Sequence, residues 1–392
     1  MNISKKKWMM YGGLAAAIVV ASFAAPALAD GPSYEDLQAR LDAAEAKIAT
    51  LDANQEPSWL ETRRSEEVKA MVQDVMADAD ARTMMMADAQ PVTVNVGGFA
   101  ITRWSYNNDG GVAENNQFSI PYARLEVSGE ILGKIGYYVS GEFSDYTNGT
   151  MELVDAYTTM DLGWGVDFQA GQFVTAFYKD FTDSPLDNVE GEYTILATTF
   201  GQGRSQGVQF SKDFDWLDLS VSYNDGFGTE NVFIVDNDYG ISVRGDVDFG
   251  GGFQLGAAYA YQSELEDYGT YTVDFGYSNG PLNAQVSWVS ADYAVGGYGK
   301  NYGFNAEVAY QCTDNLTGFV NYQHGKLGVS DSDLNVLEVG ANVDINKYVR
   351  WTTTLGYAFD AIGTEWNLYR SGWNAGDSNG QYLLRTQLSV SF

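Results

Sequence analysis

Beyond residue 90 the chain alternates between apolar and polar residues with a period of two, the pattern of strands that bury one face. In the segment 348–359, Val349, Trp351 and Leu355 share one face, and Arg350 lies on the other. The pattern predicts an all-β fold with sixteen strands, at 92–106, 120–132, 134–146, 150–162, 165–176, 204–213, 216–224, 239–249, 253–263, 269–279, 282–292, 301–312, 316–325, 334–345, 348–359 and 379–392.

The connections between these predicted strands alternate in length. Links such as 163–165 and 250–252 are short and consist of turn-forming residues, whereas the links between them are mostly longer. A soluble sandwich has no reason to keep every loop at one end short, but an outer-membrane barrel has short periplasmic turns and long external loops. We therefore expect residues 91–392 to form a 16-stranded antiparallel transmembrane β-barrel, closed on itself and apolar towards lipid.

The last residues, QYLLRTQLSVSF, read as an alternating strand that ends on Phe392. A terminus usually frays, so a strand that runs to the final residue indicates that this end is held. We expect the last strand to pair with the first and to close the barrel. A final aromatic residue on such a strand also resembles the C-terminal signal of bacterial outer-membrane proteins.

The segment before the barrel predicts export and a short helical region. Residues 1–29 contain three lysines, an apolar stretch and an Ala-Leu-Ala sequence, which together indicate a cleaved signal peptide. Apolar residues from Tyr34 to Leu51 recur at spacings of three and four, which predicts a short coiled coil within 30–56. An amphipathic helix that lies on the protein itself is the alternative. Residues 57–90 are expected to form a helical linker.

Composition limits the chemistry that the chain can perform. The net charge of −30 argues against a nucleic acid partner and favours cations near any opening. The single histidine, His324, excludes a metal site built on histidines, and no nucleophile with its base is apparent, so we expect neither an enzyme nor a cofactor. The acidic stretches 236–240 and 331–333 could bind Ca²⁺ through oxygen ligands, although neither matches an EF-hand and solvated loops are the simpler interpretation.

Three stretches of the barrel resemble the phosphate-selective porin O/P family. They are YARLEVSGEILGKIGYYVSGEF (122–143), LVDAYTTMDLGWGVDFQAGQFVTAF (153–177) and GRSQGVQFS (203–211), in the order that the family shows. The helical segment before the barrel is similar to one in porin-like proteins of planctomycetes. The resemblance implies a homotrimeric, sixteen-stranded channel in the cell outer membrane, with its coiled coil on the periplasmic side.

The longest predicted connection, 177–203, follows the fifth strand, where porins of this size fold a loop into the lumen. It is acidic, with Asp180, Asp183, Asp187, Glu190 and Glu192. If the loop folds inward, these carboxylates form the pore constriction, and rings of Asp and Glu are how cation-preferring pores are built. A solvated external loop is the alternative.

Four arginines supply the opposite charge: Arg103, Arg124, Arg350 and Arg385, on strands that closure makes neighbours. Alternation places the last three in the lumen and is ambiguous for Arg103. As a basic pore wall they resemble the arginine ladder of the phosphate-selective members. In the alternative interpretation each arginine pairs with a lumenal carboxylate, such as Glu126 or Glu130, and is structural.

The expected function is passive diffusion of ions and small hydrophilic solutes through a water-filled channel in outer-membrane lipid. We expect a weak cation preference or none, because the lumen is acidic and the loop lacks the lysine cluster of the phosphate-selective members. Two alternatives stay open. One is an anion- or phosphate-selective porin, and the other is a structural barrel that anchors the outer membrane to the periplasmic layer.

Overall fold

The computed structural model describes residues 92–108, 115–229, 231, 238–263, 268–291, 300–328, 330–376 and 378–392. The predicted signal peptide, coiled coil and helical linker lie outside the described residues. Within the described part of the chain, no helix is both long and apolar enough to cross a membrane. Residues Asn95–Glu130 and Lys134–Phe392 form one compact unit.

The sixteen predicted strands are confirmed, most of them to within a few residues at each end. They are β1 (Asn95–Asn108), β2 (Asn115–Ile131), β3 (Ile135–Glu142), β4 (Glu152–Asp161), β5 (Val166–Val174), β6 (Arg204–Asp213), β7 (Leu217–Asn224), β8 (Tyr239–Gly250), β9 (Phe253–Ser263), β10 (Tyr268–Asn279), β11 (Leu282–Ala291), β12 (Asn301–Thr313), β13 (Leu316–Leu327), β14 (Ser332–Asn346), β15 (Val349–Ala358) and β16 (Gln381–Ser391). β3 stops short of its predicted end because a 3-10 turn, η1 (Asp145–Thr147), follows it.

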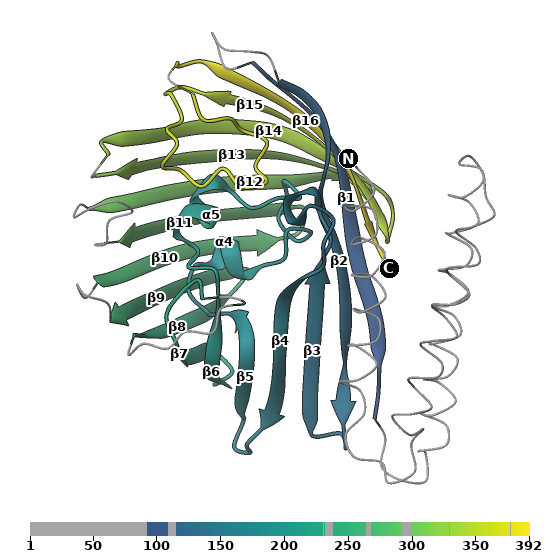
Figure 1. Ribbon diagram of the computed structural model, residues 1–392, viewed down its shortest axis with the longest axis vertical. Coiled ribbons are helices and arrows are strands. Elements are labelled where there is room, and N and C mark those ends of the chain that lie inside the picture. The colour runs from purple at the N-terminus through teal and green to yellow at the C-terminus, as the bar shows by residue number, and fades with distance from the viewer. Residues whose placement is uncertain are drawn as a thin grey trace, which may run out of the picture. The chain divides into compact units, whose positions relative to one another are not determined.

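The strands form one closed barrel in which each strand pairs with its neighbours in sequence (Figure 1). β1 closes the ring by pairing antiparallel with β16, from Phe99 opposite Ser391 to Asn108 opposite Tyr382. The final residue takes part, since Phe392 N donates to Gly98 O at 3.0 Å and Gly98 N donates to Phe392 O at 3.2 Å. The prediction that the last strand pairs with the first is therefore confirmed.

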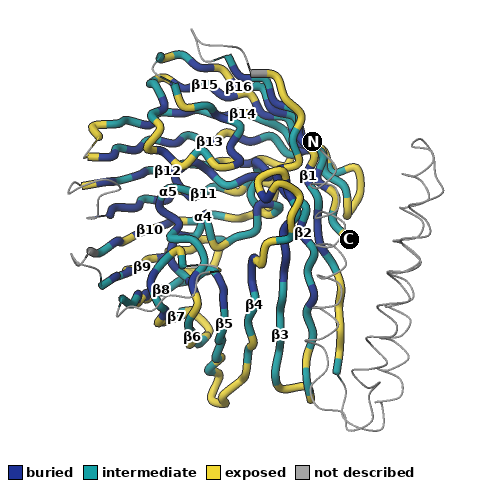
Figure 2. Tube along the Cα trace, viewed as in Figure 1, coloured by how far each residue is buried: buried dark blue, intermediate teal, exposed yellow. Residues whose placement is uncertain are grey.

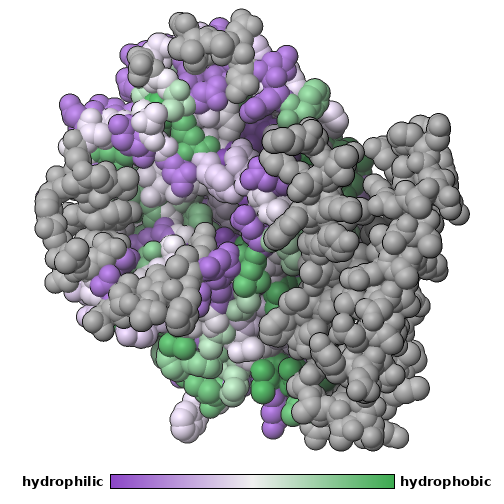
Figure 3. Space-filling model, viewed as in Figure 1, coloured by the Kyte–Doolittle hydropathy of each residue, from purple (hydrophilic) through white to green (hydrophobic). Residues whose placement is uncertain are grey.

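Buried and exposed residues alternate along many of the strands (Figure 2). Many of the buried strand residues are polar, whereas many large apolar residues are exposed on the outside of the barrel. On β15, Trp351 and Leu355 are 46% and 61% exposed, whereas Thr352 and Thr354 are 1% and 0% exposed. This arrangement is the reverse of a soluble protein and is the one that a lipid solvent requires. In the view of Figure 3, hydrophobic residues gather on the lower part of the barrel's outer surface.

Turns of a few residues join the strands at one end of the barrel, as the alternating link lengths predicted. At the other end the connections are longer, and two of them hold the most residues between strands. Residues 175–203, here called the first inner loop, contain α4 (Lys179–Thr182) and α5 (Ile195–Phe200). Residues 359–380, here called the second inner loop, connect β15 to β16.

Candidate pore constriction

The first inner loop lies inside the barrel, and α4 and α5 appear within the ring of strands in Figure 1. Thr194 caps α5 by accepting a hydrogen bond from Ala197 N at 3.0 Å. The apolar residues of α5, among them Leu196 and Phe200, are buried in one cluster with the apolar residues that line β11, β13 and β14 near their long-loop ends. The lumen is thus apolar where the loop docks, and burial of this surface holds the loop inward.

Glycine makes room for the docked helix. A Cβ atom at Gly303 on β12 would lie 2.8 Å from Leu196 Cδ2, and one at Gly325 on β13 would lie 3.1 Å from the same atom. Both contacts are tighter than ordinary packing allows. The inner surface of these two strands is therefore shaped to accept the loop. This close fit argues against the alternative that residues 177–203 form a solvated external loop.

Asp180, one of the five predicted constriction carboxylates, is buried against the barrel wall. Its carboxylate accepts hydrogen bonds from Ser287 Oγ at 3.1 Å and Asn305 Nδ2 at 2.9 Å, and from Gln285. Burial raises the pKa of Asp180 above its usual value. This side chain ties α4 to β11 and β12, so its charge is directed into the wall and away from open space.

Glu192 is completely buried and pairs with Arg103 of β1, and it also accepts a hydrogen bond from Tyr122 Oη at 2.6 Å. Glu190 is 2% exposed and lies near Glu338 of β14. Burial and the nearby negative charge of Glu338 raise the pKa of Glu190 well above its usual value. The Glu192 side chain thus holds the loop to the wall, whereas Glu190 is held through its backbone, since Gln387 Nε2 donates to Glu190 O at 3.1 Å.

The two remaining loop carboxylates are the accessible ones. Asp183 is 39% exposed at its side chain and pairs with Lys179 Nζ at 3.2 Å, one helical turn earlier. Asp187 is exposed. The five predicted residues therefore do not form one ring, because three of them point into the wall.

All four predicted arginines lie on the lumenal face, and each has a carboxylate partner. Arg103 pairs with Glu192, Arg124 Nε lies 3.3 Å from Glu142, Arg350 Nε lies 2.6 Å from Asp344, and Arg385 Nη2 lies 3.7 Å from Glu338. This is the pairing that the alternative interpretation described, although the partners differ from the suggested Glu126 and Glu130. Alternation identified the face of Arg124, Arg350 and Arg385, but it did not identify the partner of any of the four arginines.

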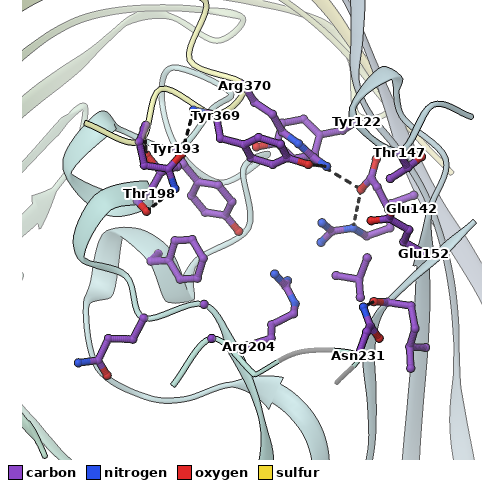
Figure 4. Close-up of a pocket in the computed structure, with 18 of the residues that line it drawn as sticks. Tyr122, Glu142, Thr147, Glu152, Tyr193, Thr198, Arg204, Asn231, Tyr369 and Arg370 are labelled. Carbon is purple, nitrogen blue, oxygen red and sulfur yellow. Dashed lines mark hydrogen bonds and ion pairs between the residues drawn. The ribbon is translucent and has the colours of Figure 1, made fainter. Parts of the chain in front are cut away.

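The open space beside the first inner loop is a cavity of about 460 Å³. It lies between that loop, the walls of β2 to β4 and the second inner loop (Figure 4). Arg124 is the one predicted arginine that lines it, together with Arg204 and Arg370. The acidic residues of its lining are Glu142 and Glu152. Rings of Tyr193, Phe181, Phe227 and Tyr369 complete its sides.

The sequence did not single out Arg204 and Arg370. Arg204 opens β6 directly after the first inner loop, and its Nε lies 2.8 Å from Asp155 Oδ1 on β4. Its place inside a stretch that resembles the porin family was the available signal. Arg370 belongs to the second inner loop, where no apolar–polar alternation indicates which side chains point into the lumen. The sequence pattern therefore gave no signal for Arg370.

A second cavity, of about 420 Å³, is strongly acidic. The acidic residues that line it are Asp213, Asp215, Asp218, Asp246, Asp248 and Asp274, against two basic residues, Lys179 and Arg244. Asp218 and Asp246 face each other directly across β7 and β8.

No group of three or more His, Cys, Asp or Glu side chains among the described residues is arranged to hold a metal ion. The suggested Ca²⁺ stretch 236–240 lies partly outside the described residues, and Asp331 of the other stretch pairs with Lys326 at 2.6 Å.

Comparison with known families agrees with this architecture. Residues 94–260 match the family model described as phosphate-selective porin O and P, which confirms the expected resemblance over that part of the barrel. No curated protein matches the chain.

Solved structures share the fold at low sequence identity. The anion-selective porin from Comamonas acidovorans superposes with a TM-score of 0.60 at 14% identity, covering 77% of this chain and 100% of that one. The in-vitro folded OmpT of Vibrio cholerae, in its trimer form, gives 0.56 at 13% identity, covering 77% and 99%. Salmonella typhi OmpF in complex with daunomycin gives 0.56 at 14% identity, covering 76% and 97%. These likenesses show that the chain has the porin fold.

Proposed function

We propose that this porin-fold chain, matched by the porin O and P family model over residues 94–260, forms a water-filled channel for passive diffusion across the outer membrane. The observation that carries the proposal is the first inner loop laid across the lumen of a closed barrel, leaving a cavity of about 460 Å³ beside it that is lined by charged and aromatic residues. Such a loop narrows a barrel without sealing it. Ions and small hydrophilic solutes are the cargo that a gap lined by charged and hydrogen-bonding groups admits. We further propose that the channel is a homotrimer in outer-membrane lipid.

For selectivity we propose a weak cation preference or none. The arginines at the first cavity are largely neutralised by adjacent carboxylates, as in the Arg124–Glu142 and Arg204–Asp155 pairs. The second cavity carries an excess of aspartates. Fixed negative charge along the path raises the local concentration of cations and lowers that of anions. Because the arginines of the first cavity are largely neutralised and the second cavity is acidic, we expect the channel to prefer cations over anions only weakly.

An anion-selective channel is the second candidate, because a specific observation favours it. Three guanidinium groups line the first cavity against two carboxylates, while three of the five loop carboxylates point into the wall. The family description names phosphate, and the Comamonas acidovorans porin is described as anion-selective. If the narrowest part dominates over the acidic chamber, anions pass preferentially.

Conductance of the full-length purified protein in planar bilayers tests the proposal. A porin gives stepwise, ohmic increases in current, whereas a barrel that serves only to anchor the membrane to the periplasmic layer gives none. The reversal potential in a KCl gradient then gives the sign of selectivity. A reversal potential near zero, or shifted slightly towards the K⁺ equilibrium potential, supports the weak cation preference. A reversal potential close to the Cl⁻ equilibrium potential supports the anion-selective candidate. Absence of channels would overturn both.

A further inference from the structure

The second inner loop is built into the lumen as firmly as the first. Ile362, Trp366 and Trp373 are at most 4% exposed. Trp366 Nε1 donates to Ser332 Oγ at 3.1 Å, and Trp373 Nε1 donates to Glu338 Oε1 at 3.0 Å. These contacts hold one side of the loop against β14.

The two inner loops are joined to each other. Asn367 N donates to Thr199 Oγ1 at 3.1 Å, and Asn367 Nδ2 donates to Thr198 O at 2.9 Å. In return Thr198 Oγ1 donates to Asn367 O at 2.6 Å. The rings of Trp366 and Phe200 meet edge to face, with centroids 6.4 Å apart. The second loop therefore extends the wall that the first loop makes, and Asn367, Tyr369 and Arg370 line the first cavity.

Arg370 attaches the far side of this loop to β2 and β3. Its guanidinium carbon lies 4.3 Å, 4.7 Å and 5.3 Å from the ring centroids of Tyr122, Tyr369 and Tyr146, which we call the tyrosine cage. Arg370 Nη1 lies 3.6 Å from Glu142 Oε2, and Nη2 donates to Ser144 Oγ at 3.3 Å. Figure 4 shows Arg370 reaching over Tyr122 towards Glu142. A planar cation suits such a site, because it can stack on rings and bind a carboxylate at once.

The backbone at Arg370 is in the left-handed region, with φ of +65°. This conformation is unfavourable for a residue with a side chain and persists where the surroundings enforce it. Arg103 supplies one such restraint by donating a hydrogen bond to Arg370 O, and the cage supplies the others. If the cage is lost, the local strain favours release of the loop.

We propose that the second inner loop is a second wall of the constriction, and that Arg370 is the positioning residue that holds it inward and so sets the width of the channel. The inference rests on the proposed channel function. With the cage intact, one narrow state dominates. With it lost, the loop alternates between an inward and an outward position, and the channel alternates between a narrow and a wide state.

The test compares wild type, Arg370→Gln and Lys326→Gln in planar bilayers, with polyethylene glycols of graded size as probes of width. Lys326 of β13 is also a basic residue with carboxylate partners, Asp331 at 2.6 Å and Asp333 at 3.3 Å, but it does not line the first cavity. We expect Arg370→Gln to raise the ratio of wide to narrow sub-states about tenfold, since one desolvated cation–π contact accounts for that factor. Larger polymers should then enter the Arg370→Gln channel, whereas Lys326→Gln should keep the wild-type size limit.

A cross-link gives the reverse experiment. The rings of Tyr146 and Tyr369 meet with centroids 4.6 Å apart. Cysteines at both positions, in an Arg370→Gln and Cys312→Ser background, can be joined by a short bifunctional thiol reagent, and the wild-type size limit should return. If Arg370→Gln fails to fold, Tyr146→Leu removes one exposed wall of the cage and should widen the channel in the same direction. A wild-type size limit in the folded Arg370→Gln or Tyr146→Leu channel would overturn the inference alone, whereas a wild-type protein without conductance would overturn the channel itself.

Discussion

Arg103 of β1 and Glu192 of the first inner loop form an ion pair that is almost completely buried, with side chains 1% and 0% exposed. The same glutamate accepts the hydroxyl of Tyr122, and the same arginine donates to Gln387 at 3.0 Å. The pair therefore connects the loop to three strands at the seam where the barrel closes. Closure of the barrel and position of the loop depend on one set of contacts.

Removal of one partner should release the loop. We expect Arg103→Gln to cost about 3–5 kcal/mol in the anchoring of the loop, because it leaves Glu192 buried and unpaired. Hydrogen exchange of residues 186–194 should accelerate, and the channel should become noisy. Arg103→Met combined with Glu192→Leu removes both charges and should recover much of the protection. If the single and the double variant exchange at the same rate, the ion pair does not anchor the loop.

The charges that line the first cavity offer a matched pair of substitutions for selectivity. Arg124→Gln removes a positive charge from the lining, and Glu152→Gln removes a negative one. Because one charge near a partly desolvated path is worth on the order of 1 kcal/mol, each should change the K⁺ to Cl⁻ permeability ratio by about fivefold.

The two shifts should have opposite signs, towards K⁺ for Arg124→Gln and towards Cl⁻ for Glu152→Gln. Reversal potentials in a KCl gradient measure both, and high salt should reduce them. Identical potentials in the two variants would show that ions do not pass this cavity.

The strands were predictable from sequence because they share one physical condition. Each must present an apolar face to lipid, and much of the lumenal face is polar, so many of the strands alternate with a period of two, as Trp351 at 46% and Thr352 at 1% exposure illustrate. The short turns were equally visible. For most strands, the residues on the lumenal face could therefore be predicted by counting along the strand.

The interior contacts could not be counted in this way. The acidity of the first inner loop was plain, but whether Asp180 faces solvent or Ser287 depends on how the loop packs against strands about a hundred residues later. Arg370 lies in a connection without a period, so its direction was undetermined. Alternation assigned Arg124 to the lumen without identifying Glu142 as its partner, since the partner depends on register between strands.

The seam between the first and last strands depends on Gly98. Its φ is +157°, and a Cβ atom there would overlap with the carbonyl oxygen of Arg124 and crowd the ring of Phe392. We expect Gly98→Ala to destabilise the folded barrel by about 2–3 kcal/mol, from strain and forced separation of β1 and β2.

Gly276→Ala on β10 is the matched control, because its nearest neighbour would lie at an ordinary 3.8 Å. The temperature at which the folded species unfolds on a detergent gel should fall for Gly98→Ala and stay close to wild type for Gly276→Ala. Equal unfolding temperatures for the two variants would contradict the role of Gly98.

Glu190 should make the position of the first inner loop sensitive to pH. It is buried beside Glu338, with Arg385 as the nearby cation, so two carboxyl groups share one positive charge. Burial, followed by the negative charge of Glu338, raises the pKa of Glu190 well above its ordinary value of 4.5. A raised pKa means that the docked loop binds a proton more tightly than the free loop does. The stabilisation is therefore complete below the ordinary value and is lost as pH rises through the raised one.

We expect current noise and exchange of residues 186–194 to increase as the pH is raised from mildly acidic to alkaline. Glu190→Gln keeps the neutral form at every pH and should remove this dependence while leaving the loop docked. Arg350→Gln, at a loop contact without a buried carboxyl pair, should retain it. The prediction fails if the wild type and Glu190→Gln respond to pH alike, because the protonation that controls docking would then belong to another group.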